Sequence, residues 1–314
     1  MIDLVTLGES MALFTARRTG LLRHARDFGL GVGGAESNVA IGVVRLGASA
    51  AWIGRVGADE FGELLRSTLS GEGVDVRGMR VDPEAPTGLM VKSRRTAEVV
   101  DVRYYRSASA GSRLRPADLD VTLIRSARVL HVTGITLALS ASAADAVHAA
   151  VAEARAAGVT VSMDVNYRRA LWTPERASAA LREIVPAVDV LFATEAEARL
   201  VVDGDDPVAL ARALSDLGPC HVLIKRGALG AVEVSDGTVR HAEPYPVTEL
   251  DPVGAGDAFA AGWLAETIAG ADPERRLATA CAAGAFAVTA EGDWESLPRR
   301  CDLDLLSPAD AVSR

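Results

Sequence analysis

The most restrictive feature of the sequence is a regular alternation of short apolar strands with helical segments in its second half. Strands are predicted at residues 129–133, 159–166, 190–193 and 221–225, helices at residues 141–157, 174–185 and 207–217, and a hairpin near residues 231–241. Strands joined through helices form parallel sheets that are covered on both faces. The pattern therefore predicts an α/β fold whose ligands bind at the carboxyl ends of the strands.

The length and charge of the chain favour one domain that acts on small molecules. Nothing in the 314 residues forces a split, so we treat residues 1–314 as a single domain. The chain has 33 basic and 42 acidic residues, a net charge of −9, and no basic patch for a nucleic acid. The three cysteines lack metal-ligand spacing, and neither a leader peptide nor an apolar run of membrane-spanning length is present. We expect a cytoplasmic protein without a nucleic-acid or membrane partner.

Between residues 86 and 112 the pattern changes from helix-linked strands to a hairpin. Residues 87–93 and 99–107 are predicted strands, and with strands from residues 13–33 they would form a small β lid. The alternation of side chains along a strand places Tyr104 and Arg106 on one face. The alternative is an exposed edge strand with a solvated arginine.

Residues 250–262, L-D-P-V-G-A-G-D-A-F-A-A-G, predict a loop that leads into a helix. The first turn of that helix, around Gly254, Ala255 and Gly256, leaves backbone N–H groups free to bind an anion such as phosphate. A carboxylate beside a phosphate is repelled, unless it accepts a proton from the attacking hydroxyl. Asp257 is therefore a candidate catalytic base, and the alternative is that it only caps the helix.

Two other regions carry candidate ligand-binding residues. Gly33 and Gly34 precede a helix predicted at residues 35–46, and Asn38, one turn inside it, can point back towards a ligand. Arg168 follows a predicted strand and could bridge a substrate carboxylate and a transferred phosphoryl group. The alternatives are a glycine-rich turn with a solvated Asn38, and an Arg168 that only pairs with Asp164.

Together these motifs resemble those of the ribokinase-like (PfkB) carbohydrate kinases, from Leu7 to about Asp293. D-P-V-G-A-G-D-A-F at residues 251–259 is similar to the C-terminal signature of that family, and G-G-x-x-x-N at residues 33–38 to its sugar-binding motif. The resemblance implies a three-layer α/β/α sandwich with a mainly parallel central sheet and a small β-sheet lid. It also implies that Asp257 is the catalytic base and that the backbone of residues 254–257 forms an anion hole.

The same resemblance assigns residues to the sugar, to ATP and to metal ions. The implied sugar-binding residues are Gly34, Ala35, Asn38 and Asp293. The implied ATP-binding residues are Asn166, Lys225, Gly227, Gly230, Gly254, Ala255, Gly256 and Cys281. Glu197 would hold Mg²⁺ through water, although Thr194 replaces an asparagine that the family often has beside it, and Asp251 and Val253 would hold a monovalent cation such as K⁺. Cys281 departs from the asparagine that close relatives carry near the adenine.

Two stretches narrow the substrate, because they resemble the 2-keto-3-deoxygluconate kinases. They are Tyr104-Tyr105-Arg106 in the lid and D-V-N-Y-R at residues 164–168, which is followed by Leu171-Trp172. The resemblance implies that Tyr104, Arg106 and Arg168 contact a sugar acid whose 6-hydroxyl receives the γ-phosphate of ATP. One departure is Met90, where those kinases can have a lid tyrosine.

Other functions remain open on the sequence. A fructokinase or ribokinase-type enzyme would act on a neutral sugar, which has no carboxylate for these arginines. A non-catalytic sugar or nucleotide sensor would not need Asp257, and a dehydrogenase would need a glycine-rich G-x-G-x-x-G that residues 7–10 lack. Because a lid leaves an apolar outer face to cover, we also expect a homodimer or a larger even homo-oligomer through the lid.

Overall fold

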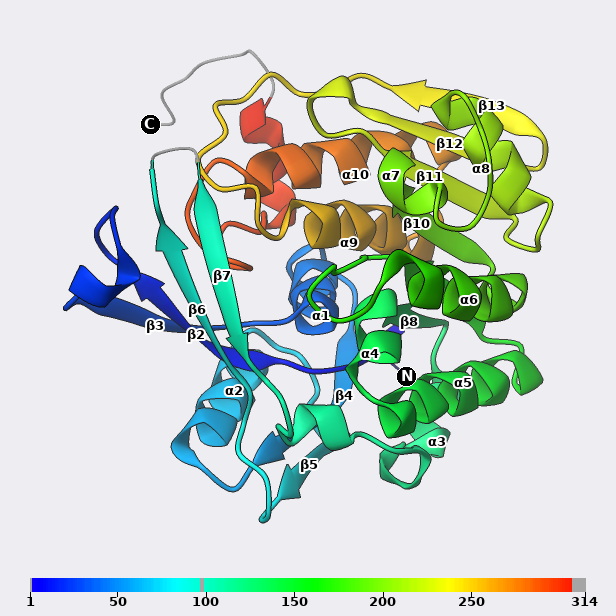
Figure 1. The fold of residues 1–314 in the computed structure, drawn as a ribbon. Helices are drawn as coiled ribbons and strands as arrows, with labels where there is room; N and C mark the ends of the chain where they lie inside the picture. The colour runs from blue at the N-terminus through cyan, green and yellow to red at the C-terminus, as the bar shows by residue number, and fades with distance from the viewer. Residues whose placement is uncertain (1, 97–98, 307–314) are drawn as a thin grey trace.

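The computed structural model describes residues 2–96 and 99–306, which form two β-sheets with surrounding helices (Figure 1). The larger sheet has nine strands in the order β13-β12-β11-β10-β9-β8-β1-β4-β5. Its parallel strands are β1 (Leu4–Leu7), β4 (Ala50–Gly57), β5 (Met79–Asp82), β8 (Val129–Thr133), β9 (Thr160–Asp164), β10 (Val190–Thr194) and β11 (His221–Lys225), and the antiparallel ones are β12 (Ala231–Ser235) and β13 (Thr238–Ala242). The predicted parallel sheet is confirmed. β9 ends earlier than predicted, because Asn166 adopts a left-handed φ of 43°.

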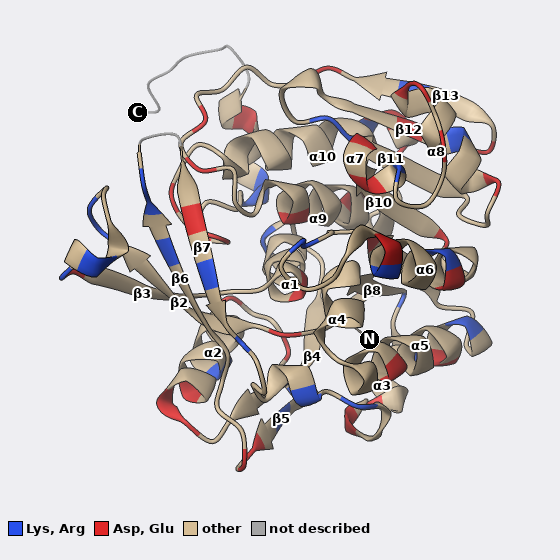
Figure 2. Cartoon of the chain, viewed as in Figure 1, with Lys and Arg blue, Asp and Glu red and all other residues tan. Residues whose placement is uncertain are grey.

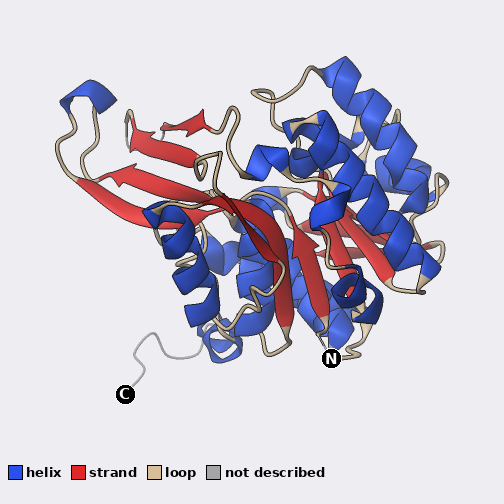
Figure 3. Ribbon diagram, turned by 90° about the horizontal axis from the view of Figure 1, so that it is seen from below, coloured by secondary structure: helices blue, strands red, loops and turns tan. Residues whose placement is uncertain are grey.

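Helices cover both faces of this sheet, which makes three layers (Figure 3). One face carries α3 (Val121–Ser126), α4 (Gly134–Leu139), α5 (Ala141–Ala156), α6 (Pro174–Ile184), α7 (Glu195–Ala198) and α8 (Pro207–Ser215). The other carries α1 (Ala35–Arg45), α2 (Glu60–Gly71), α9 (Ala255–Ile268) and α10 (Pro273–Ala287). The helices predicted at residues 141–157, 174–185 and 207–217 are present within one or two residues.

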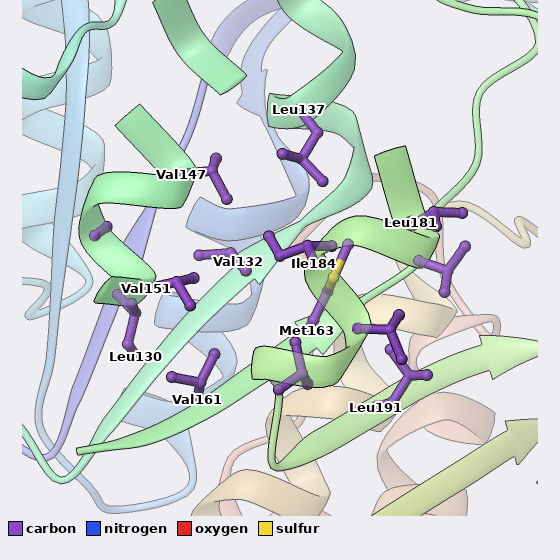
Figure 4. Packing of buried hydrophobic residues seen from close by; sticks show 14 of the residues in the cluster. Leu130, Val132, Leu137, Val147, Val151, Val161, Met163, Leu181, Ile184 and Leu191 are labelled. Carbon is purple, nitrogen blue, oxygen red and sulfur yellow. The ribbon is translucent and has the colours of Figure 1, made fainter. Parts of the chain in front are cut away.

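The hydrophobic core has two parts, one on each face of the large sheet, because neighbouring residues of a strand point to opposite faces. On β10, Leu191 packs under α6, whereas Phe192 faces α9, where its ring lies edge-on to Phe259 and Trp263. Figure 4 shows the first of these cores, in which side chains of β8, β9 and β10 interlock with those of α4, α5 and α6. The rigid sheet fixes the strand ends that surround the candidate site.

The smaller sheet, here called the lid, consists of β3 (Phe28–Gly33), β2 (Met11–Ala16), β6 (Leu89–Arg94) and β7 (Val100–Tyr105), in that order. β6 and β7 are antiparallel, so the predicted hairpin is confirmed, while β2 and β6 are parallel. Met11, Leu13 and Met90 form a small apolar cluster on its inner face. The lid projects beyond the helical layers (Figure 3), and basic residues mark β6 and β7 (Figure 2). Within the described residues, no helix is long and apolar enough to cross a membrane.

Candidate active site

A cavity of about 950 Å³ lies between the lid and the carboxyl ends of the parallel strands. The lid contributes Met11, Met90, Lys92 and Tyr104 to its walls, and Arg106, which directly follows β7, also lines it. The start of α1 contributes Gly34, Ala35 and Asn38, which the sequence predicted to bind the sugar. A cavity of this size accommodates a ligand larger than a single sugar.

Asp257 stands in the first turn of α9, which begins at Ala255. The residue before the helix, Gly254, has a φ of 83°, and a Cβ there would lie 2.2 Å from the carbonyl oxygen of Asp293. Only glycine fits this position. Within the described chain, the N–H groups of Gly256 and Asp257 have no hydrogen-bond partner, which leaves them free to bind an anion at the helix start.

The Asp257 carboxylate is held between two asparagine amides. Asn38 Nδ2 donates to Oδ2 at 2.8 Å, and Asn166 Nδ2 lies 3.4 Å from Oδ1. Asn166 was predicted to contact ATP, and in this structure it faces the base. Burial raises the pKa of Asp257 to about 7, although the Asn38 amide opposes this shift. A carboxylate with this pKa suits proton abstraction near neutral pH.

A lysine ammonium lies beside the start of α9. Lys225 Nζ donates to Asp164 Oδ2 at 2.6 Å and would be 3.3 Å from a Cβ at Gly256. Burial lowers the pKa of Lys225, but Asp164 and Glu197 outweigh burial and raise it, so the ammonium stays charged. The cavity therefore has a fixed positive charge next to the free N–H groups.

Arg168 is an exposed guanidinium that lines the same cavity. It makes no ion pair with any described residue, and its one hydrogen bond is to the neighbouring Tyr167 carbonyl at 3.4 Å. The alternative in which Arg168 pairs with Asp164 is wrong, because Asp164 is bound to Lys225. Arg168 is available to an anionic ligand.

Tyr104 and Arg106 both face the cavity from the lid, with the guanidinium 5.5 Å from the ring centroid. Arg106 is not free. Its Nε and Nη2 lie 2.6 Å from Glu9 Oε2, and Ser109 donates to the other carboxylate oxygen. Sequence reasoning missed Glu9, although an acidic residue directly after the first strand is a signal for the ligand-binding edge. Of the three guanidinium nitrogens of Arg106, only Nη1 lacks a partner among the described residues.

A buried cluster joins the lid to the loop before α9. Lys92 Nζ, on β6, lies 2.5 Å from Asp251 Oδ2 and 3.5 Å from Asp293 Oδ1. Burial raises the pKa of Asp293 to about 6, and Lys92 opposes that shift. Asp293, the predicted sugar-binding residue, lines the cavity. Asp251, predicted with Val253 to hold a monovalent cation, is paired with an ammonium. Lys92 was not predicted.

The predicted nucleotide residues line another part of the cavity. Gly227, in the turn after β11, has a φ of 57°, and no atom lies within 4 Å of its Cβ position. Gly230 closes this turn, and Cys281 approaches from α10. Burial raises the pKa of the Cys281 thiol to about 12, so it stays neutral. This part of the cavity suits the uncharged portion of a nucleotide.

Glu197 is the predicted residue for a divalent metal. Its carboxylate accepts the N–H groups of Thr194 and Tyr167, both at 2.8 Å. Burial opposes ionisation, but Lys225 and these N–H groups lower the pKa of Glu197. Among the described residues, no three His, Cys, Asp or Glu side chains gather into a metal site. The donors fit Mg²⁺ held mainly by phosphate oxygens and contacted by one carboxylate through water.

Comparison with known proteins agrees with this geometry. The chain matches the pfkB family of carbohydrate kinases over residues 1–300. It is 41% identical over 303 residues to a 2-dehydro-3-deoxygluconokinase of Thermoproteus tenax, which covers 95% of this chain and 92% of that protein. A 2-dehydro-3-deoxygluconokinase of Bacillus subtilis (strain 168) is 38% identical over 303 residues, which covers 95% and 93% of the two chains. A structure from E. coli, described as a Ribokinase II in complex with ATP and Mg²⁺, matches with a TM-score of 0.90 at 29% identity over 98% of this chain and 99% of the other. The chain belongs to the pfkB family of carbohydrate kinases.

Proposed function

We propose that this kinase transfers the γ-phosphate of ATP to the 6-hydroxyl of 2-keto-3-deoxy-D-gluconate. The observation that carries the proposal is Arg168, a guanidinium that lines the same cavity as the base Asp257 and makes no ion pair with any described residue. A sugar acid brings a carboxylate that would pair with it, whereas a neutral sugar would leave the charge without a partner. The names of the relatives from T. tenax and B. subtilis support the same substrate.

In the proposed reaction, Asp257 accepts the proton of the 6-hydroxyl. The sugar oxygen forms a bond to the γ-phosphorus while the bond from that phosphorus to the bridging oxygen of ADP breaks. The free N–H groups at the start of α9 and the Lys225 ammonium stabilise the negative charge on the transferred group. Asn38 and Asn166 orient the carboxylate that takes the proton.

ATP and Mg²⁺ are supported by the E. coli structure that contains both. The turn at Gly227 and Gly230 and the thiol of Cys281 would contact the nucleotide. Glu197 would help to hold Mg²⁺ through water, and the metal, when bound, would supply positive charge that neutralises the phosphates during transfer.

Residues 1–314 would act as one kinase domain, and the lid with its flanking residues, roughly 13–33 and 86–112, would cover the sugar. Tyr104 and Nη1 of Arg106 would contact the sugar acid from above, together with Gly34, Ala35, Asn38 and Asp293 from the core. A closed lid would exclude water, so the phosphoryl group passes to sugar and not to solvent.

A fructokinase-type enzyme is the alternative, and one observation favours it. The charge of Arg106 is already balanced by Glu9, so of the arginines assigned to a substrate carboxylate only Arg168 lacks an ion pair among the described residues. The position of Arg168 still favours a sugar acid as the substrate.

The lid also suggests an assembly, because its outer face exposes Phe28, Leu30 and Tyr105, with Leu30 54% exposed. We propose a homodimer or larger even oligomer that buries this face, in the ATP-containing cytoplasm. Cys220, Cys281 and Cys301 are free thiols, as a reducing compartment allows.

The proposed substrate is tested by coupled ADP release with 2-keto-3-deoxygluconate, its galactonate epimer, fructose and ribose. We expect kcat/KM to be highest for a keto-deoxy acid. A higher value for fructose or ribose would replace the sugar-acid assignment with the neutral-sugar one.

A further inference from the structure

The carboxylate of Asp251 organises the loop that leads into α9. It is 1% exposed, and its oxygens accept the N–H groups of Val253 and Gly292, both at 3.3 Å. Gly292 precedes Asp293, whose carbonyl packs against Gly254 at the helix start. The Asp251 carboxylate therefore ties together the two segments that shape the start of α9, where the N–H groups of Gly256 and Asp257 are free within the described chain.

The charge of this buried carboxylate is balanced from the lid. Lys92 Nζ lies 2.5 Å from Asp251 Oδ2, and the lysine side chain is 4% exposed. Arg94, two residues further along β6, donates to the carbonyl of Leu250 at 2.6 Å and lies 3.9 Å from the same carboxylate oxygen. Two cationic side chains of one lid strand thus hold the start of the loop that leads into α9.

The residue type at position 92 is unusual for this chain. Of its 33 basic residues only Lys92 and Lys225 are lysines, and both ammonium groups are paired with aspartates beside the candidate site. A lysine ammonium is a compact point charge, whereas the guanidinium used elsewhere in the chain is a planar fork. Among side chains, an ammonium is the group most similar in size and charge to a monovalent metal ion.

These residues do not fit the K⁺ ion that the resemblance implied at Asp251 and Val253. An ion bound to Asp251 would share that carboxylate with the Lys92 ammonium, and two like charges at this separation repel. Asp293, the other acidic neighbour, also faces Lys92, at 3.5 Å.

We propose that Lys92 replaces the monovalent cation, so that this kinase carries its own fixed positive charge beside the anion hole and turns over without K⁺. The inference rests on the anion-hole role proposed above for residues 254–257. Because Lys92 belongs to β6, the lid itself supplies this charge to Asp251. Lys92 is a positioning residue that acts on the phosphoryl site through Asp251.

The first test compares cations on the wild-type enzyme. Turnover and Tm are measured in chloride salts of K⁺, Na⁺, Rb⁺ and tetramethylammonium at one ionic strength. We expect less than about a twofold spread in turnover, because only general screening changes. A wild-type enzyme that needs K⁺ for turnover would overturn the proposal.

The second test removes the ammonium. In tetramethylammonium, Lys92→Ala should lower turnover by about 10- to 100-fold, because a displaced anion hole loses its alignment with the phosphoryl group. K⁺ or NH₄⁺ should restore turnover and raise the Tm of this variant only, since an ion that binds the folded state stabilises it. A merely structural lysine would give no cation-specific rescue, so a variant that responds to no monovalent ion, or stays unfolded in every salt, contradicts the proposal.

Three controls separate charge from packing. Lys92→Arg retains the charge and should stay insensitive to the cation. Lys92→Ala combined with Asp251→Asn removes both charges and should lose the response to K⁺. Arg103→Ala removes an exposed basic residue from the neighbouring strand β7 and should match the wild type. The Tm readout needs no sugar, so it remains decisive even if the kinase acts on a substrate other than the one proposed.

Discussion

Asn38 and Asp257, which are 219 residues apart in the sequence, share a buried hydrogen bond of 2.8 Å from Nδ2 to Oδ2. The bond joins the first turn of α1 to the first turn of α9 and so links the candidate sugar site to the phosphoryl site. Oδ1 of Asn38 is buried and has no hydrogen-bond partner in the described part of the chain. Asn38 also lines the cavity, so one side chain holds the base at the edge of the candidate sugar site.

Replacing the base tests its role directly. Asp257→Asn preserves the shape of the side chain but cannot accept a proton, and we expect turnover to fall by roughly 10²- to 10⁴-fold. ATP affinity, measured by calorimetry, should change little, and Asp145→Asn on the exposed surface of α5 is the matched control. Near-normal turnover of a folded Asp257→Asn enzyme would remove Asp257 from the mechanism.

The pH profile should report the same carboxylate. Because burial raises the pKa of Asp257 to about 7, kcat/KM should fall about tenfold per pH unit below that value and level off above it. Asn38→Ala removes a donor that stabilises the ionised form, so the acid limb should move to higher pH. An acid limb near the ordinary carboxyl range, in wild type and variant alike, would show that another group titrates.

The raised pKa of Asp257 also has a consequence for stability. Between the ordinary value of 3.8 and about 7, the folded state keeps a proton that the unfolded state has lost. Stability therefore falls as pH rises through this window, and Asp257→Asn should remove a cost of at most about 4 kcal/mol above it. Urea unfolding of both proteins at pH 4 and pH 8 measures the difference, which should be larger at pH 8.

Much of the site could be predicted because its signals are local. The glycines before Asp257 and the position of Asn38 within a first turn depend on neighbouring residues, and the structure brings both into one cavity. The alternation along the strand predicted at residues 99–107 placed Tyr104 and Arg106 on one face, and both line the cavity, although Arg106 directly follows the end of β7.

The ion pairs could not be predicted, because they depend on how distant elements approach one another. Glu9 follows β1 and meets Arg106 across 97 residues, and Lys92 meets Asp251 across 159. A single charged residue on a predicted lid strand is typical of a solvated side chain, so burial of Lys92 was not expected. The rarity of lysine in this arginine-rich sequence was the available signal.

The proposed assembly is tested on the outer face of the lid. β3 pairs with β2 so that Leu30 lies opposite Phe14, whose ring packs edge-on against Phe61 of α2. Leu30 remains exposed next to this contact. Leu30→Glu should halve the mass of a dimer in light scattering, whereas Arg26→Glu on the exposed segment before β3 should not. A wild-type chain that is monomeric at working concentration would contradict the proposal.

The pair of Arg106 and Glu9 should affect stability and sugar binding separately. Arg106→Ala leaves a fully buried carboxylate without its partner, which should cost about 3–5 kcal/mol of unfolding free energy. Adding Glu9→Gln should recover much of that stability, because no unpaired charge remains. The sugar acid KM should stay raised in both variants, since neither has the Nη1 donor that the lid offers to the sugar. Recovery of KM along with stability would assign Arg106 a structural role only.

Arg168 decides between a sugar acid and a neutral sugar. Its guanidinium lines the cavity without an ion pair among the described residues, so Arg168→Ala should leave the fold intact. For the sugar acid, kcat/KM should fall by a factor that corresponds to about 2–5 kcal/mol. The value of kcat should fall too, because Arg168 lies close enough to Asp257 to lower the pKa of Asp257. At that position it can also act on the charge that develops in transfer. Fructose lacks the carboxylate, so its weak turnover should decrease less, and the difference between the two losses measures the contribution of the carboxylate.

Arg169→Ala, an exposed neighbour outside the cavity lining, is the matched control and should leave the turnover of both substrates unchanged. Equal losses for the acid and for fructose would mean that Arg168 serves only the phosphoryl group, and the fructokinase-type alternative would then replace the sugar acid.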